Sequence, residues 1–249
     1  MPELNLYSLL VIAGSFALGG LTKGTFGLGM PMLALPVLVF VVPYQIAVAL
    51  FVIPNITANL QQALHQGRWK NNLRRYLWLI LPMLVTILFS VRILVRIEQK
   101  TGLLILGLIS LVFVATQAFP IKLGFRASWE RWLNPLVGVA AGALCGISGL
   151  YGPILIVYLM AQRLPKEEFV SALSLMYLMG SIPLAVGLAS AGFLTGEVVA
   201  TSFAGAAIIG FMILIGKRFR DRLNEARYRK LILGLLFLIG CTLLRRALL

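Results

Sequence analysis

Long charge-poor runs alternate with short polar segments along the whole chain. Ten such runs fall at about residues 6–22, 30–43, 45–64, 76–95, 102–121, 133–148, 150–162, 169–190, 197–216 and 231–248. An α-helix rises about 1.5 Å per residue, so that about 20 apolar residues are needed to cross a bilayer. The second and seventh runs are short by this measure, and we expect them to form half-helices or re-entrant segments. The pattern predicts an all-α polytopic membrane protein.

The composition excludes an ordinary water-soluble domain. Of the 249 residues, 60% are hydrophobic and 12% are charged, whereas about a quarter of the residues are charged in soluble domains. The net charge of +14 can indicate nucleic-acid binding, but the basic residues lie in the loops between apolar runs, as in polytopic proteins. We therefore expect the lipid bilayer as a partner, and no nucleic acid.

The basic loops also predict the orientation of the chain. If the first two runs form one hairpin and the sixth and seventh another, with the N-terminus outside, alternate loops hold 14 and 5 Lys and Arg residues. The larger set lies in residues 68–75, 122–131 and 217–230 and the smaller in 92–100 and 245–246. Merging the first two runs gives 9 against 12 and no bias. Because Lys and Arg are enriched in cytoplasmic loops, the hairpin interpretation is favoured.

A pattern of glycine and proline recurs at a constant offset of 122 residues. Its members are Gly20, Gly24, Gly27 and Pro31, followed by Gly142, Gly146, Gly149 and Pro153. Each half contains five apolar runs, and the strongly basic loops of one half correspond to weakly basic loops of the other. Residues 1–125 and 126–249 are therefore predicted to be two inverted repeats of five hydrophobic segments each, with short or broken helices after the glycine-rich motifs. This arrangement is typical of secondary transporters, whose binding site lies near the midplane where the interruptions meet.

The two glycine motifs are candidate anion sites. The first offers Gly20, Thr22, Lys23, Gly24, Thr25, Gly27, Gly29 and Pro31, and the second Gly146, Ser148, Gly149, Tyr151, Gly152 and Pro153. Dense glycine ends one helix and proline suits the first turn of the next, so each motif is expected to present backbone N–H groups at a helix N-terminus. The alternative is close packing between membrane helices. The duplication and the short following run favour a site.

Polar residues inside two apolar runs extend this candidate site. Asn55 and Asn59 lie four residues apart, on one face of a helix, and the offset of 122 pairs them with Tyr177 and Ser181. They either line a cavity or form hydrogen bonds between helices.

No other chemistry is indicated in the apolar runs. The eight carboxylates lie in loops or at the ends of segments, so coupling to protons or sodium has no obvious side-chain carrier. The single histidine, His65, and the two cysteines form no metal-ligand cluster. We expect neither a catalytic site, nor a metal, nor a cofactor, because no pair of nucleophile and base is present.

The motifs resemble those of the TauE/SafE family of sulfite exporters. The resemblance rests on Gly20–Pro36, on Gly146–Pro153 followed by Leu159, and on the step from Leu164 to Glu168. It implies a multi-pass transporter of the bacterial inner (plasma) membrane for small sulfur-containing anions such as sulfite, sulfoacetate or related organosulfonates, usually an exporter. Some members have an acidic residue and four consecutive glycines where this chain has Lys23 and Gly27-Leu28-Gly29-Met30, which is closer to the sulfite-exporter branch.

Pattern and resemblance together predict a secondary transporter of such anions. In this hypothesis the two glycine-motif helix ends hold the anion, and one bundle rocks against the other to alternate access. The alternative hypothesis is an anion channel that uses the same motifs as a filter.

Overall fold

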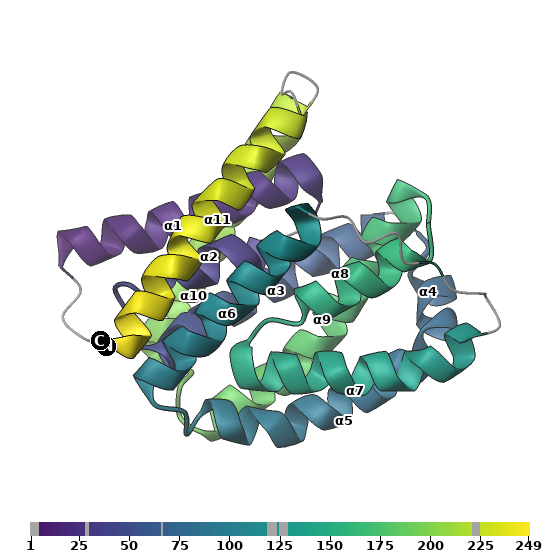
Figure 1. Cartoon of the computed structure of the whole chain (residues 1–249), viewed down its shortest axis with the longest axis horizontal. Coiled ribbons are helices and arrows are strands. Elements are labelled where there is room, and N and C mark those ends of the chain that lie inside the picture. Colours follow the sequence, from purple (N-terminus) through teal and green to yellow (C-terminus); the bar gives the residue numbers. More distant parts are fainter. Residues whose placement is uncertain (1–4, 28–29, 66, 119–123, 125–128, 221–224) are drawn as a thin grey trace. The chain divides into compact units, whose positions relative to one another are not determined.

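The structure is a computed structural model, and it describes residues 5–27, 30–65, 67–118, 124, 129–220 and 225–249. In these residues the backbone forms helices and turns and no β-strand (Figure 1). The helices are α1 (Leu6–Phe26), α2 (Met30–Leu38), α3 (Tyr44–His65), α4 (Trp69–Arg75), α5 (Leu77–Leu94), α6 (Gln99–Ala118), α7 (Glu130–Ser148), α8 (Gly152–Ala161), α9 (Lys166–Ser190), α10 (Gly196–Arg220) and α11 (Glu225–Leu248).

Each of the ten apolar runs forms a helix, so the predicted all-α polytopic architecture is confirmed. Seven of the described helices are long and apolar enough to cross a membrane, namely α1, α3, α5, α6, α9, α10 and α11. Helices α2 and α8 have 9 and 10 residues. The second and seventh runs are therefore short helices, as the length of their apolar pattern predicts.

Helix α4 is the element that the apolar pattern does not predict. Its seven residues are mostly polar, and a helix this short is not stable by itself. Tertiary contacts hold it: Asn72 is buried, and its Nδ2 donates to the hydroxyl of Ser171 on α9 at 2.9 Å. Helix α4 therefore depends on a hydrogen bond to a residue 99 positions away in the sequence, which the local apolar pattern does not reveal.

The two glycine motifs end their helices in the same way. Gly27 follows α1 with φ 79°, and Gly149 follows α7 with φ 72°. The N–H of Gly27 donates to the carbonyl of Lys23 at 2.8 Å, and that of Gly149 to the carbonyl of Cys145 at 2.6 Å. This left-handed conformation is open to glycine and costly for other residues, so each motif needs glycine at this position.

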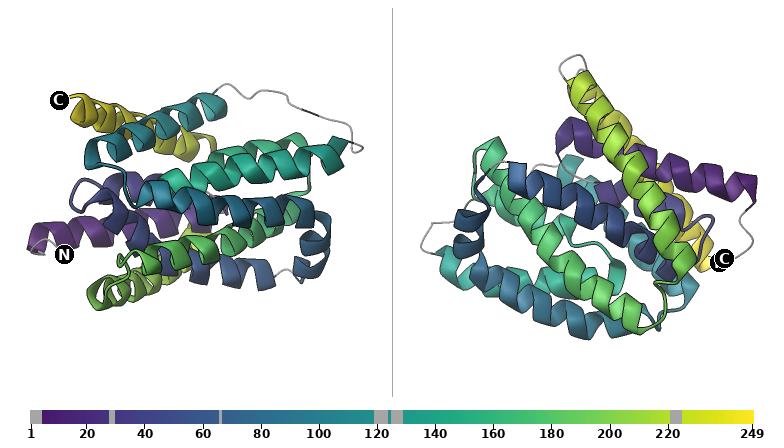
Figure 2. Two further views of the ribbon diagram at one scale, coloured as in Figure 1. Left: turned by 90° about the horizontal axis from the view of Figure 1, so that it is seen from below. Right: turned by 180° about the vertical axis from the view of Figure 1, so that it is seen from behind.

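Contacts divide the chain into two compact units. The first unit consists of Met1–Pro54, Ile97–Ile121 and Gly196–Leu249, and the second unit of Asn55–Arg96 and Lys122–Thr195. In the first unit α1 packs on α10, and α6 packs on α11 (Figure 2). In the second unit α5 packs on α7 and also contacts α9. Each unit thus combines helices from both halves of the sequence, and the predicted repeat boundary at residues 125–126 lies outside the described residues.

Glycines bring the paired helices of the first unit into backbone contact. A Cβ atom on Gly20 would lie 2.8 Å from the carbonyl oxygen of Ile209, and one on Gly24 would lie 2.5 Å from that of Ile213. Small residues allow membrane helices to approach in this way. The geometry at Gly20 and Gly24 is therefore that of helix packing between α1 and α10.

The second unit uses the same device between α7 and α5. A Cβ atom on Gly142 would lie 2.6 Å from the carbonyl oxygen of Met83, and one on Gly146 would collide with the side chain of Ser90. The hydroxyl of Ser90 donates to the carbonyl of Gly142 at 3.1 Å. Gly146, like its counterpart Gly24, thus serves the contact between two helices.

Candidate functional site

The N-terminus of α8 follows directly from the second glycine motif. After Gly149 the chain turns through Leu150 and Tyr151, and α8 starts at Gly152 with Pro153 in its first turn. Proline suits this position because its ring fixes φ at a helical value. An N–H group in this first turn would have no intrahelical acceptor, so its absence costs no hydrogen bond.

The backbone donors at this helix end have no side-chain cap. Tyr151 occupies the N-cap position without a side-chain hydrogen bond. The N–H of Leu155 returns to the carbonyl of Tyr151 at 3.3 Å, and by helix geometry the N–H groups of Gly152 and Ile154 have no intrahelical acceptor. Helix N-termini with such donors bind anions, and the helix dipole adds to the attraction.

Tyr177 of α9 adds a side-chain donor at the same helix end. Its hydroxyl is buried and has no hydrogen-bond partner among the described residues. The hydroxyl oxygen lies 2.5 Å from the position of a Cβ atom on Gly152, and the ring packs edge-on against Tyr151 with centroids 4.7 Å apart. Buried hydroxyls are normally hydrogen-bonded. An unpartnered one beside a helix N-terminus therefore points to a ligand that accepts hydrogen bonds.

A buried polar cluster behind the helix end holds Tyr151 and α9 in place. The Tyr151 hydroxyl donates to the carbonyl of Tyr177 at 2.7 Å and lies 3.0 Å from the hydroxyl of Ser181. Nδ2 of Asn55 on α3 donates to both hydroxyls, Tyr151 and Ser181, at 2.8 Å each. Asn59 donates to the backbone carbonyl and the side-chain oxygen of Asn55 at 2.7 Å. The geometry of Asn55 and Ser181 is that of hydrogen bonding between helices, one of the two predicted alternatives.

The structure thus brings together much of the second half of the predicted site. Gly152, Pro153, Tyr151 and Tyr177 meet at the start of α8, and Ser148 is the last residue of α7, just before the turn. The Ser148 hydroxyl donates to the carbonyl of Leu144 at 2.6 Å and accepts from the N–H of Leu150 at 3.1 Å. Ser148 therefore supports the turn by local hydrogen bonds.

The first motif lies in the first unit. The hydroxyls of Thr22 and Thr25 donate to the carbonyls of Leu18 and Leu21 at 2.7 and 3.0 Å, within α1. Lys23 is buried in the last turn of α1. Pro31 is the second residue of α2, the counterpart of Pro153 in α8. Gly29 lies outside the described residues.

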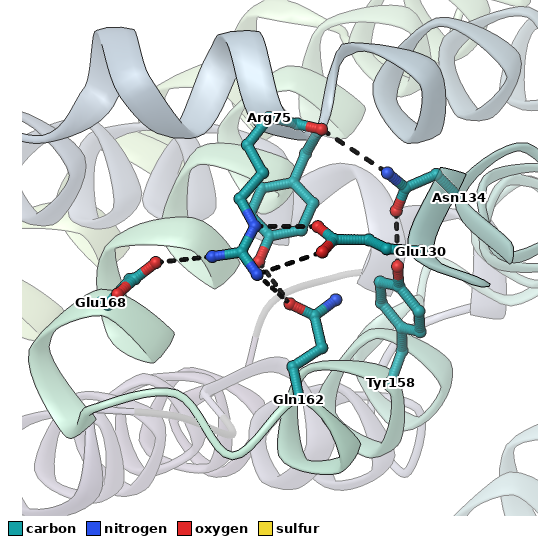
Figure 3. Close-up of polar contacts among 7 residues, drawn as sticks. Arg75, Glu130, Asn134, Tyr158, Gln162 and Glu168 are labelled. Atoms are coloured by element: carbon teal, nitrogen blue, oxygen red, sulfur yellow. Dashed lines mark hydrogen bonds and ion pairs between the residues drawn. The ribbon is translucent and has the colours of Figure 1, made fainter. Parts of the chain in front are cut away.

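An ion-pair cluster at one end of the second unit is a feature that the sequence analysis missed (Figure 3). The guanidinium of Arg75, at the end of α4, contacts Glu130 and Glu168 at 2.8 Å each. It also donates to Oε1 of Gln162 at 3.2 Å, and the hydroxyl of Tyr76 donates to the same atom at 2.7 Å. The hydrogen bond to Glu130 raises the pKa of Arg75, and burial raises the pKa of Tyr76. Both groups therefore keep their protons at neutral pH.

Two further side chains extend this cluster. The hydroxyl of Tyr158 on α8 donates to Oδ1 of Asn134 on α7 at 2.5 Å, and the amide of Asn134 reaches the carbonyl of Arg75 at 3.5 Å. Glu130 and Glu168 stand in the first turns of α7 and α9, where acidic residues suit the helix dipole. The sequence shows that Glu130 and Glu168 lie at the ends of apolar segments. It does not identify Arg75 as the common partner of these two carboxylates.

The described residues contain no group of three His, Cys, Asp or Glu side chains that could hold a metal ion. Comparison with protein families matches residues 11–243 to the family described as "Sulfite exporter TauE/SafE". The matched range includes both glycine motifs. No curated protein and no solved structure in the comparison matches the chain.

Proposed function

Because the chain belongs to the TauE/SafE family of sulfite exporters, a family of membrane transporters, we propose that it is a secondary transporter of small sulfur-containing anions. The substrates in this proposal are sulfite, sulfoacetate or related organosulfonates, and the location is the bacterial inner membrane. Seven described helices long and apolar enough to span a bilayer support the multi-pass arrangement.

One observation carries the proposal: the unpartnered hydroxyl of Tyr177 lies at the N-terminus of α8. Backbone N–H groups can only donate, so a ligand held by those of Gly152 and Ile154 must be an acceptor. The oxygens of sulfite and of a sulfonate are acceptors with negative charge, which the helix dipole also favours. Such donors act strongly in a site from which water and its high dielectric constant are excluded.

We propose that the chain is an inverted duplication, and that this duplication supplies the transport mechanism. Helices α2 and α8 begin at Met30 and Gly152, and α3 and α9 begin at Tyr44 and Lys166, each pair 122 residues apart. Gly27 and Gly149 share the left-handed conformation. These correspondences support a duplication, and the loop charges favour opposite orientations of the two repeats. In transporters built from inverted repeats, alternating access brings a midplane site to each side in turn. The N-terminus of α8 in the second unit is the element that we propose to bind the anion, and we propose the same role for its counterpart after the first glycine motif.

Flux into proteoliposomes tests the proposal. We expect saturable transport of labelled sulfite or sulfoacetate, with sulfate as the comparator, measured with and without a pH or sodium gradient. Loading the opposite side with unlabelled substrate should accelerate exchange, because a carrier shows counterflow and a channel does not.

Variants of the motif glycines link this flux to the site. Gly27→Leu and Gly149→Leu should abolish transport and leave membrane insertion intact. Gly192→Leu is the matched control, because Gly192 has a similar φ of 78° and open space around it but lies outside both motifs. Loss of flux in all three variants alike, or in none of them, contradicts the assigned site.

A further inference from the structure

The second unit contains a groove that the proposed transport site does not use. It lies between the C-terminal ends of α5 and α9 and has a volume of about 470 Å³. The residues of its lining that matter here are Leu88, Phe89, Arg92, Arg96, Val186 and Ser190. Pockets of roughly 300–1,000 Å³ accommodate ligands of substantial size.

The two helices that form the groove touch each other at two of its lining residues, Val91 and Gly187. A Cβ atom on Gly187 of α9 would collide with the side chain of Val91 on α5, so the helices touch at this level. The apolar walls are open: Leu88, Phe89 and Val186 are 44%, 64% and 56% exposed. Because α5 and α9 are both long and apolar enough to span a membrane, these walls are suited to hydrocarbon.

The end of the groove is basic. Arg92 and Arg96 line it and are exposed, and neither guanidinium forms an ion pair with a described residue. The guanidinium of Arg92 lies over the ring of Phe89, 5.7 Å from the ring centroid. The positive charge is therefore next to an apolar side chain of the groove. The apolar span of α5 ends at Leu94, two residues after Arg92 and two before Arg96, so both cations are near the end of the span. A favourable interaction with the helix dipole explains a basic residue here, but it does not explain the adjoining apolar groove.

We propose that this groove is a binding site for an anionic glycerophospholipid such as phosphatidylglycerol. One acyl chain lies along Leu88, Phe89 and Val186, and the phosphate accepts hydrogen bonds from Arg92 and Arg96. The hydroxyl of Ser190, which donates to the carbonyl of Gly187 at 2.9 Å, is at the same end as the arginines. Basic pockets between membrane helices recognise anionic headgroups by this combination of charge and apolar contact.

Native mass spectrometry of the full chain in detergent, with added lipid, tests this site. The purified protein should retain phosphatidylglycerol about tenfold more strongly than phosphatidylcholine. Arg92→Gln combined with Arg96→Gln should remove this preference. The matched control is Arg245→Gln with Arg246→Gln, which changes the net charge equally at the last turn of α11 and should retain the lipid as the unmodified protein does. Equal retention of both lipids by the unmodified protein, or undiminished retention by the Arg92/Arg96 variant, overturns the proposal.

A second measurement uses the unmodified chain and does not depend on the folding of a variant. A phosphatidylglycerol analogue with a photoreactive acyl chain should label peptides from residues 88–96 and 186–191. Labelling confined to other peptides overturns the site. Neither experiment measures anion flux, so the lipid site and the transport site succeed or fail separately.

Discussion

The hydroxyl of Tyr177 occupies the space that any side chain on Gly152 would need. A Cβ atom on Gly152 would lie 2.5 Å from this oxygen and 3.6 Å from the adjoining ring carbon, Cζ. The glycine therefore allows α9 to place a donor beside the first turn of α8. The hydroxyl has no partner among the described residues, so the close approach leaves a donor available for a ligand.

Gly152→Ala should displace the Tyr177 ring, lower the thermal stability and abolish sulfur-anion flux. Combining it with Tyr177→Phe removes the colliding oxygen, and Cζ at 3.6 Å is an ordinary contact. The double variant should therefore regain the melting temperature, Tm, of the unmodified protein, yet its flux at low sulfite concentration should stay as low as that of Tyr177→Phe alone. Recovery of both Tm and flux in the double variant contradicts a binding role for the hydroxyl.

Tyr151→Phe should destabilise the second unit, because the hydroxyl of Tyr151 contacts Asn55, Ser181 and the carbonyl of Tyr177. A buried polar group that loses its hydrogen-bond partner lowers the free energy of unfolding by about 1–3 kcal/mol. Thermal unfolding in detergent measures the loss as a lower Tm. Tyr7→Phe, at an exposed tyrosine of α1, is the control and should not change Tm. Equal Tm values for the two variants would show that the cluster does not stabilise the fold.

Gly149→Ala should lower stability, because alanine must adopt the positive φ of 72°. The left-handed conformation costs about 1–2 kcal/mol for residues with a Cβ atom. Gly210→Ala is the control: Gly210 lies inside α10 with open space and no positive φ, so alanine there should be neutral or stabilising. A Tm for Gly149→Ala at or above that of Gly210→Ala contradicts the assigned conformation.

Arg75→Lys should destabilise the end of the second unit where Arg75 joins Glu130, Glu168 and Gln162. The planar guanidinium serves several acceptors at once, and an ammonium group does not reproduce this geometry. The decrease in Tm should become smaller in high salt, since the side chain of Arg75 is 37% exposed and its charge is partly screened.

Removing the charge of one glutamate tests the stabilising effect of the same ion-pair cluster. Glu130→Gln should lower Tm more than Glu98→Gln, because Glu98 belongs to no ion pair of the described residues. The same Tm for both variants would mean that the cluster has no net stabilising effect.

Much of the fold could be predicted from the sequence, because the length of an apolar run and the position of a glycine determine the local structure of the chain. The ten runs predicted ten helices, and the pattern of Gly27 and Gly149 predicted where two of them end. Helix α4 was missed since its seven residues have no apolar periodicity and depend on contacts with α9.

Long-range pairing limited the prediction of the site. Asn55 and Ser181 could be recognised as polar positions inside apolar runs, but the offset of 122 paired them with Tyr177 and Asn59 and not with each other. Their hydrogen bond spans 126 residues. Arg75 was recognised only as a basic loop residue, because its partners Glu130 and Glu168 lie 55 and 93 residues away. The unpartnered state of the Tyr177 hydroxyl is likewise a property of the packed structure and has no local signature.

The most direct test of the transport site is the flux of labelled sulfite in proteoliposomes containing Tyr177→Phe. Removing an unpartnered buried hydroxyl should leave Tm unchanged or raise it, so a loss of flux cannot be attributed to unfolding. The loss of one hydrogen bond to a charged ligand should reduce flux at low sulfite concentration about 10- to 100-fold. Flux equal to that of the unmodified protein at every sulfite concentration would contradict anion binding at the N-terminus of α8.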